Sequence, residues 1–180
     1  MEHRHRLHLL GGIAAIVLAA QVHARVFMTQ QQALASAFPA GTRVTRQAVF
    51  LTPEQASAAK KESGLEFNDR MIVRYTGVAG DRLLGYAYFD THRVRTLPET
   101  IMVVITPEGT LGKIEILSFD EPPEYLPKPR WIDQFKRRRL DDDLSLKRAI
   151  RPISGASLSG RAIVNASRKV LALHRIIGGK

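Results

Sequence analysis

The sequence predicts an α+β domain, in which an antiparallel sheet of four to six strands packs against helices and a long helix forms the C-terminal end. Three observations predict this class. β-Branched or alternating segments follow one another through short connections in the middle of the chain, which favours antiparallel pairing. Two earlier segments carry helix-capping patterns. The last segment repeats apolar side chains every three or four residues, as an amphipathic helix does.

The first residues predict a secretory signal. Arg4 and Arg6 precede an apolar run over residues 9–20, and Val22-His23-Ala24 after it has the small or modest residues suited to a cleavage site. This run is shorter than the about 20 apolar residues that a membrane-spanning helix needs. We therefore expect a signal peptide at 1–24, with a short membrane anchor as the alternative. A single domain at 25–180 is then expected to lie in the periplasm or elsewhere outside the cytoplasm.

Two capping boxes predict the first two helices. Thr29 is followed three residues later by Gln32, and Thr52 is followed in the same way by Gln55. In such pairs each side chain accepts a hydrogen bond from the backbone N–H of the other residue. A proline ends the first helix after two turns, and Gly64 provides the left-handed residue that commonly ends a helix like the second.

The strands of the sheet are predicted from runs of β-branched and aromatic residues. Turn-forming residues separate them, most clearly in Pro-Glu-Gly-Thr at 107–110, which is typical of a hairpin. The expected strands lie at 43–51, 71–75, 83–89, 100–106 and 111–117. A proline-rich loop at 120–129 and a short aromatic helix at 130–135 follow them.

The last helix is expected at 159–177, where the apolar stripe lies. The segment just before it, 154–159, reads Ser-Gly-Ala-Ser-Leu-Ser. Free backbone N–H groups at a helix N-terminus together with hydroxyl groups can bind an anion. A serine N-cap after a glycine turn is an equally ordinary interpretation of these residues. The residues alone leave both possibilities open.

Composition excludes several classes of function. The chain has 27 Lys and Arg against 17 Asp and Glu, a formal net charge of +10, which favours anionic partners. It has no cysteine, so disulfides, thiolate metal sites and iron–sulfur clusters are excluded. The two histidines after residue 24, His92 and His174, are too far apart in sequence to predict a metal site. The basic run at 136–139 lacks interleaved aromatic residues, so nucleic acid is not an expected partner.

A serine hydrolase is a third and weaker possibility. The segment around Ser157 lacks the second glycine of a Gly-x-Ser-x-Gly elbow. His174 would lie about five turns away on the same predicted helix, roughly 25 Å from Ser157. No catalytic residue is therefore expected.

Three segments resemble a known family. Residues 154–164 resemble the Ser/Thr-Gly-Ala-Thr-x-Ser/Thr segment of FMN-binding domains. These are the extracytoplasmic flavin domains found in the Rnf complex and in the sodium-pumping NADH:quinone oxidoreductase. Residues 112–123 are similar to a strand of that family and the His-x-Glu-Thr-Pro-Gly segment after it, and 131–135 are similar to its following Trp-Ile…Phe helix. The order and spacing agree over roughly 71–173.

The resemblance implies that FMN is the cofactor. In the family, a flavin transferase commonly joins the FMN phosphate to the threonine that matches Ser157. The resemblance implies phosphate binding by Ser154, Gly155, Ala156, Ser157, Leu158 and Ser159. It places Glu121, Tyr125 and Trp131 near the isoalloxazine ring. Arg151 stands where the family usually has Asp, six residues before the modified position, and its charge could help to hold the phosphate. Covalent and non-covalent attachment both stay open.

We therefore expect an exported FMN-binding electron-transfer protein, a redox carrier more than a stand-alone enzyme. Its partners would be a membrane or periplasmic redox protein and, if the flavin is covalent, a flavin transferase. The alternative is a cofactor-free basic extracytoplasmic binding module that docks on anionic protein or lipid surfaces. The Arg-rich run at 136–139 and the departures from the family pattern motivate this alternative.

Overall fold

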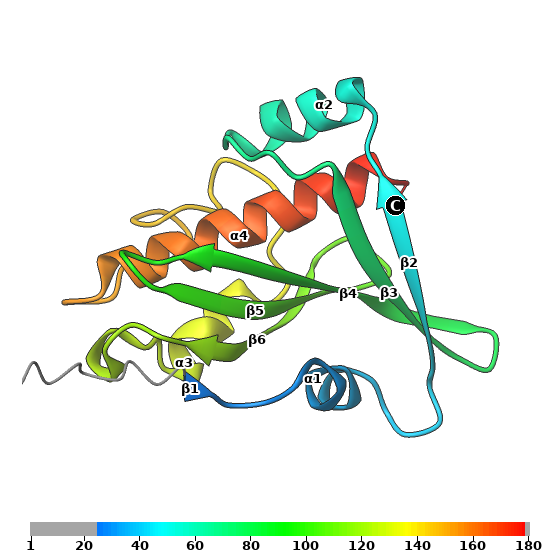
Figure 1. Cartoon of the computed structure of the whole chain (residues 1–180), viewed down its shortest axis with the longest axis horizontal. Helices are drawn as coiled ribbons and strands as arrows, with labels where there is room; N and C mark the ends of the chain where they lie inside the picture. Colours follow the sequence, from blue (N-terminus) through cyan, green and yellow to red (C-terminus); the bar gives the residue numbers. More distant parts are fainter. Residues whose placement is uncertain (1–24, 179–180) are drawn as a thin grey trace, which may run out of the picture.

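A computed structural model describes residues 25–178, so the predicted signal at 1–24 lies outside the described residues. Within them, six strands form one antiparallel sheet in the order β1-β6-β5-β4-β3-β2 (Figure 1). The strands are β1 (Arg25–Val26), β2 (Arg43–Phe50), β3 (Met71–Ala79), β4 (Arg82–Arg93), β5 (Pro98–Ile105) and β6 (Leu111–Phe119). The predicted α+β class with a long C-terminal helix is confirmed.

Helices lie on both faces of the sheet. Figure 1 shows α4 along one face with α2 beyond it, and α1 on the opposite face. The helices are α1 (Gln30–Ala37), α2 (Pro53–Ser63), α3 (Pro129–Ile132) and α4 (Ser157–Ile176), with short 3₁₀ turns η1 (Pro123–Tyr125) and η2 (Asp133–Phe135). None of the helices in the described part of the chain is long and apolar enough to span a membrane.

The two predicted capping boxes are present. Thr29 Oγ1 accepts a hydrogen bond from Gln32 N at 3.2 Å, and Gln32 Oε1 accepts one from Thr29 N at 2.8 Å. Thr52 and Gln55 form the same pair of bonds at 3.2 and 3.0 Å. Gly64 ends α2 in the left-handed conformation, with φ of 70°. These elements follow from local sequence because each cap is completed within one helical turn.

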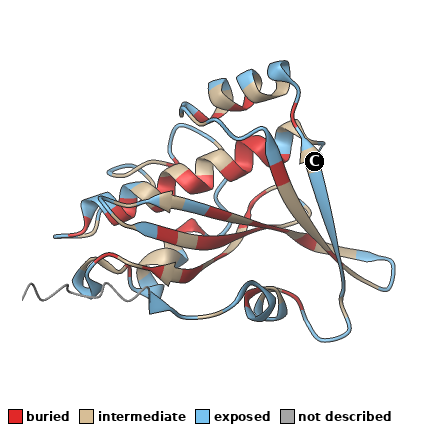
Figure 2. Ribbon diagram, in the orientation of Figure 1, coloured by how far each residue is buried: buried red, intermediate tan, exposed pale blue. Residues whose placement is uncertain are grey.

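Side chains that alternate between the two faces of the central strands form two hydrophobic cores, one on each side of the sheet. On β5, Ile101, Val103 and Ile105 belong to the large core under α4, whereas Met102 and Val104 belong to a smaller core under α1. Successive strand residues point to opposite faces, so a central strand that is covered on both sides is apolar throughout. Figure 2 shows the buried residues concentrated in the middle of the sheet and along α4.

Three strands differ clearly from the predicted ones, and one of them, β3, extends to Ala79, beyond the predicted end at residue 75. β1 was not predicted, because two residues are too few to show a strand pattern; it pairs Arg25 with Phe119 at the edge of the sheet. β4 extends to Arg93, beyond the predicted end at residue 89. The extension carries polar residues, among them His92, that have partners on neighbouring elements.

Gly77 in β3 allows α1 to pack on the sheet. A Cβ atom at this position would lie 2.5 Å from the Phe38 ring, which is 5% exposed. We expect Gly77→Ala to lower the free energy of unfolding by about 1–3 kcal/mol, the usual range for overpacking a core. Urea unfolding would measure this change.

The matched test is the double variant Gly77→Ala with Phe38→Leu. The smaller side chain makes room for the methyl group, so the double variant should lose less stability than the two single changes added together. Additive losses would show that the ring and the methyl group do not compete for space.

Candidate functional site

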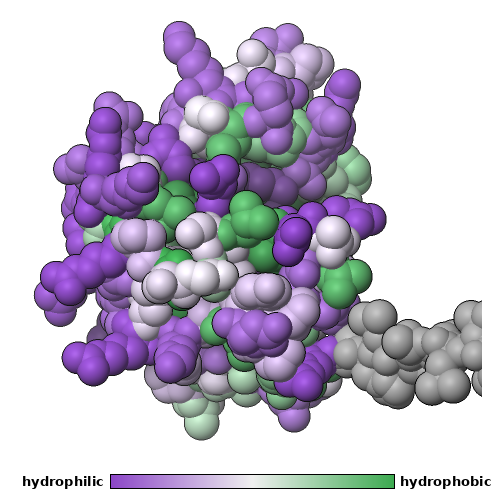
Figure 3. All heavy atoms as spheres, turned by 90° about the vertical axis from the view of Figure 1, so that its left-hand side faces the viewer, coloured by the Kyte–Doolittle hydropathy of each residue, from purple (hydrophilic) through white to green (hydrophobic). Residues whose placement is uncertain are grey.

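A cavity of about 280 Å³ lies at the N-terminus of α4. Five consecutive residues, 155–159, form one wall, and Val94, Arg95, Glu121 and Tyr125 line the rest. Figure 3 views the end of the molecule at which α4 begins, where hydrophilic side chains surround small hydrophobic patches. The structure therefore brings together three segments that are far apart in sequence.

The predicted site residues divide into two groups. Glu121 and Tyr125 lie in the same cavity as Gly155, Ala156, Ser157, Leu158 and Ser159. Ser154 is exposed and does not line this cavity, and neither do Trp131 and Arg151.

The start of α4 differs from the predicted start at residue 159. The helix begins at Ser157, after the N-cap residue Ala156, which cannot offer a side-chain cap. Gly155 turns the chain with φ of 77°, a left-handed conformation that favours glycine. The serine N-cap interpretation is therefore wrong, and the first-turn N–H groups of α4 have no side-chain cap.

Ser159 contributes a second unsatisfied group to the same place. Its side chain is 1% exposed, and Oγ has no hydrogen-bond partner among the described residues. Buried hydroxyl groups are normally hydrogen-bonded, since an unmade bond is energetically unfavourable. A buried, unpaired hydroxyl in the wall of a cavity at a helix N-terminus indicates a place for a polar ligand.

Glu121 forms hydrogen bonds with the loop between β4 and β5, which lines another side of the cavity. It is 5% exposed, and its Oε1 accepts hydrogen bonds from the backbone N–H groups of Arg95, Thr96 and Leu97 at 3.1, 2.6 and 2.8 Å. Burial alone would raise the pKa of Glu121, but these three N–H groups outweigh it and keep the pKa below its usual value. Glu121 is therefore a carboxylate that fixes the β4–β5 loop.

Trp131 does not line the cavity but contacts the chain on either side of residues 155–159. Its Nε1 donates a hydrogen bond to the Arg151 carbonyl at 2.6 Å, and its ring lies so close to Gly160 that a Cβ there would be 3.3 Å from Cζ2. The ring also meets Phe135 edge-on, with 5.4 Å between centroids. Trp131 thus ties the chain that enters α4 to the α3 segment.

Sequence reasoning missed Val94 and Arg95. They lie between β4 and β5, in a segment for which we predicted no role. Only the contact between Glu121 and this loop, across more than twenty residues of sequence, brings them to α4. Arg95 is exposed and forms no ion pair within residues 25–178.

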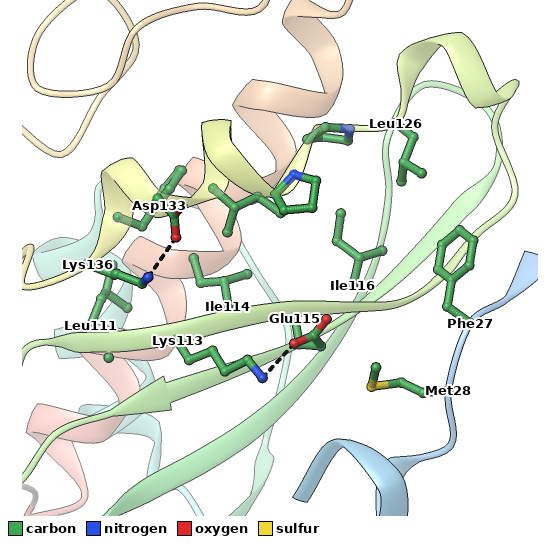
Figure 4. A pocket seen from close by; sticks show the side chains of 15 residues that line it. Phe27, Met28, Leu111, Lys113, Ile114, Glu115, Ile116, Leu126, Asp133 and Lys136 are labelled. Atoms are coloured by element: carbon green, nitrogen blue, oxygen red, sulfur yellow. Dashed lines mark ion pairs between the residues drawn. The ribbon is translucent and has the colours of Figure 1, made fainter. Parts of the chain in front are cut away.

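A larger cavity, of about 480 Å³, runs along β6 and is mainly apolar (Figure 4). Its charged side chains pair with one another: Lys113 with Glu115 at 2.8 Å, and Lys136 with Asp133 at 2.7 Å. Its lining includes part of α3, but this helix has four residues and is too short to bind an anion at its N-terminus. The smaller cavity at α4 is thus better suited to an anionic group.

A buried charge network lies between α4 and the ends of β4 and β5. His92 Nδ1 bonds to Asp90 Oδ2 at 2.8 Å, and His92 Nε2 bonds to Glu99 Oε2 at 2.9 Å. Lys169 Nζ lies 2.8 Å from Asp90 Oδ1 and 2.7 Å from Asp69 Oδ2. None of the His, Cys, Asp and Glu residues in the described ranges forms a group of three or more suited to a metal ion.

The network shifts several pKa values. Burial would lower the pKa of His92, but the hydrogen bonds to Asp90 and Glu99 and their charges raise it to about 9. Burial would raise the pKa of Asp90, but His92 and Lys169 hold it below its usual value. Burial raises the pKa of Glu99, which is fully buried. His92 is thus a cation held between two carboxyl groups at neutral pH.

His174 is the opposite case. It is 2% exposed, and its Nδ1 lies 2.6 Å from the Tyr88 hydroxyl. Burial, with a smaller contribution from the charge of Arg74, lowers the pKa of His174 to about 4. The imidazole is therefore neutral and shares a hydrogen bond with the Tyr88 hydroxyl, whose own pKa is raised by burial. Such a histidine, near the opposite end of α4 from Ser157, does not form a hydrolase pair with it.

Neither a model of a known protein family nor a curated protein sequence matches this chain.

Proposed function

We propose that this chain is an exported FMN-binding electron-transfer protein that holds the flavin phosphate at the start of α4, where residues 155–159 line the cavity. Two independent considerations support the proposal. The sequence resembles FMN-binding domains at three ordered segments. Residues from two of these segments, Glu121 and Ser157 among them, line one cavity. The observation that carries the proposal is the buried, unpaired Ser159 hydroxyl beside the uncapped start of α4.

The residues present fit a phosphate group. A phosphate needs several hydrogen-bond donors, and the first-turn N–H groups of α4 with the Ser157 and Ser159 hydroxyls offer them. The volume of about 280 Å³ is slightly below the about 300 Å³ at which typical ligand pockets begin, so the cavity suits the phosphate end of a flavin and not the whole molecule. Val94, Tyr125 and Leu158 provide the apolar surface that a flavin ring favours, and Leu158 is 44% exposed.

The protein's own role would be to bind and orient the cofactor. FMN supplies one- and two-electron transfer when bound. The helix N–H groups would bind the phosphate, and Gly155 would let the backbone approach it closely. Ser157 is exposed at the first position of α4, so it would be accessible to a flavin transferase. Arg151 lies outside the cavity lining, so the cation beside the phosphate would be Arg95 instead.

In-gel flavin fluorescence tests the proposal. The full chain would be expressed with a flavin transferase, exported, denatured and separated on a gel, with an absorption spectrum taken from the native sample. We expect a fluorescent band that disappears completely in Ser157→Ala, because that variant lacks the oxygen that would be esterified. A yellow native sample with a dark band would instead establish non-covalent FMN.

Ser154→Ala is the matched control. It removes a hydroxyl from the same turn, but Ser154 does not line the cavity, so this variant should keep the flavin. A colourless native sample of the unmodified chain would refute the proposed function. Equal loss of flavin in both variants would show that Ser157 is not the attachment point.

Edge strand β2 favours the alternative function. Seven of its eight residues are exposed, and they include Arg43 and Arg46. A basic, solvent-facing strand could dock on an anionic surface. If the protein is colourless, sedimentation with phosphatidylglycerol vesicles tests this function: Arg43→Gln with Arg46→Gln should weaken binding, and added salt should abolish it. Binding that resists salt would count against it.

A further inference from the structure

The loop between β4 and β5 is held from two directions. Glu121 Oε1 accepts hydrogen bonds from the backbone N–H groups of Arg95, Thr96 and Leu97. Arg93 Nη1 donates a hydrogen bond to the Thr96 carbonyl at 2.7 Å. Three consecutive N–H groups directed at one carboxylate oxygen fix the backbone of this loop. The position of Arg95 at the cavity therefore depends on Glu121.

Arg95 lines the same cavity as the start of α4. It is the one Lys or Arg among the lining residues, and its side chain makes no hydrogen bond or ion pair with the described residues. The one acidic lining residue, Glu121, already shares its charge with three N–H groups. An arginine, uncapped helix N–H groups and the unpaired Ser159 hydroxyl thus meet in one place.

We propose that this cavity selects a phosphate monoester, with Arg95 as the residue that supplies the counter-charge and Glu121 as a positioning residue that holds Arg95 there. A phosphate monoester carries a charge of about −1.5 to −2 at pH 7. Arginine matches its oxygens through two parallel hydrogen bonds. This inference rests on the proposed function and adds to it: the site would distinguish FMN from riboflavin, which has the same ring and no phosphate.

Binding measurements on the unloaded protein test the selection. The full chain would be exported from a host that lacks a flavin transferase, and dissociation constants would be measured for FMN, riboflavin and inorganic phosphate. We expect FMN to bind at least about tenfold more tightly than riboflavin. We expect Arg95→Gln to weaken FMN about 10- to 100-fold, the range for a lost hydrogen bond to a charged group, and to leave riboflavin unchanged.

Arg151→Gln is the matched control for charge. Arg151 is exposed and close in sequence to the turn, but it does not line the cavity, so FMN affinity should change little.

Glu121→Gln tests the positioning role. It should weaken FMN as Arg95→Gln does, and the double variant should be little weaker than either single variant, because both changes remove the same contact. Circular dichroism would verify that each variant is folded.

The outcomes separate this inference from the proposed function. Equal affinity for FMN and riboflavin, or equal weakening by Arg151→Gln and Arg95→Gln, would overturn the inference and leave the flavin function standing. Phosphate binding that depends on Arg95, with no binding of either flavin, would refute the flavin function and support the anion site. A failure of all three probes to bind would overturn both.

Discussion

Raising the pH from 6.5 to 9 is expected to lower the free energy of unfolding by about 3 kcal/mol. The pKa of His92 is 6.5 in the unfolded chain and about 9 in the folded protein, so the folded state binds the proton more tightly. The stability that this contributes is complete below pH 6.5 and is lost as the pH rises through 9. A shift of one pKa unit corresponds to about 1.4 kcal/mol. Urea unfolding at pH 6.5, 7.5 and 9 measures the loss.

The variant His92→Gln provides the control. It can keep a hydrogen bond to one of the two carboxyl groups but does not titrate, so its stability should change little between pH 6.5 and 9. Glu99 also makes the protein less stable as the pH rises. Its pKa is higher in the folded protein than the usual 4.5, so the stability that its protonated form contributes is lost above pH 4.5. His174 acts in the other direction: its lowered pKa makes stability fall as the pH drops from 6.5 towards 4. If His92→Gln showed the same alkaline loss, the titration of His92 would not be its cause.

Replacing Asp90 by Asn is expected to lower the free energy of unfolding by about 3 kcal/mol. Asp90 is 6% exposed and is the one group in the network that bonds to both cations, His92 and Lys169. The amide keeps the shape but removes the charge, so two partly buried cations lose a partner. Removing one member of a buried ion pair typically destabilises by about 3–5 kcal/mol. Thermal and urea unfolding at pH 7 would measure the effect.

The matched control is Asp133→Asn. Asp133 forms a bond to Lys136 at 2.7 Å, a distance similar to those of Asp90, but both side chains are more than half exposed. Exposed pairs contribute about 0–1 kcal/mol, so this variant should be close to the unmodified protein. If the two variants lost equal stability, burial would not be what gives the Asp90 pairs their strength.

The elements that the sequence predicted well are those built from local signals. The capping boxes at Thr29 and Thr52 are each completed within one helical turn, and the apolar stripe of α4 repeats every three or four residues along one helix. β1 could not be predicted, because its two residues are a strand only through their pairing with β6. The serine-rich turn at 154–159 was predicted as a candidate site. Whether a serine caps α4 depends on the residue at which the helix begins, and α4 begins at Ser157, two residues before the predicted start.

The polar contacts between distant segments could not be predicted. His92 and Glu99 meet because they are register partners on β4 and β5, and Lys169 joins them only after α4 packs on the sheet. A signal for part of this network was present, since Asp90 and His92 are two residues apart and share a face of a strand. The contact between Glu121 and Arg95 had no comparable signal, because both lie in loops.

The uncapped start of α4 links ligand occupancy to folding. α1 and α2 begin with complete capping boxes, yet the longest helix begins after an alanine. An alanine N-cap gives up about 1 kcal/mol relative to serine, threonine or aspartate. A ligand that binds only the folded state adds stability in proportion to the logarithm of its concentration. A ligand bound at this site would thus offset the stability that α4 lacks at its N-cap. Ligand binding would therefore raise the melting temperature of the domain and protect α4 from proteolysis.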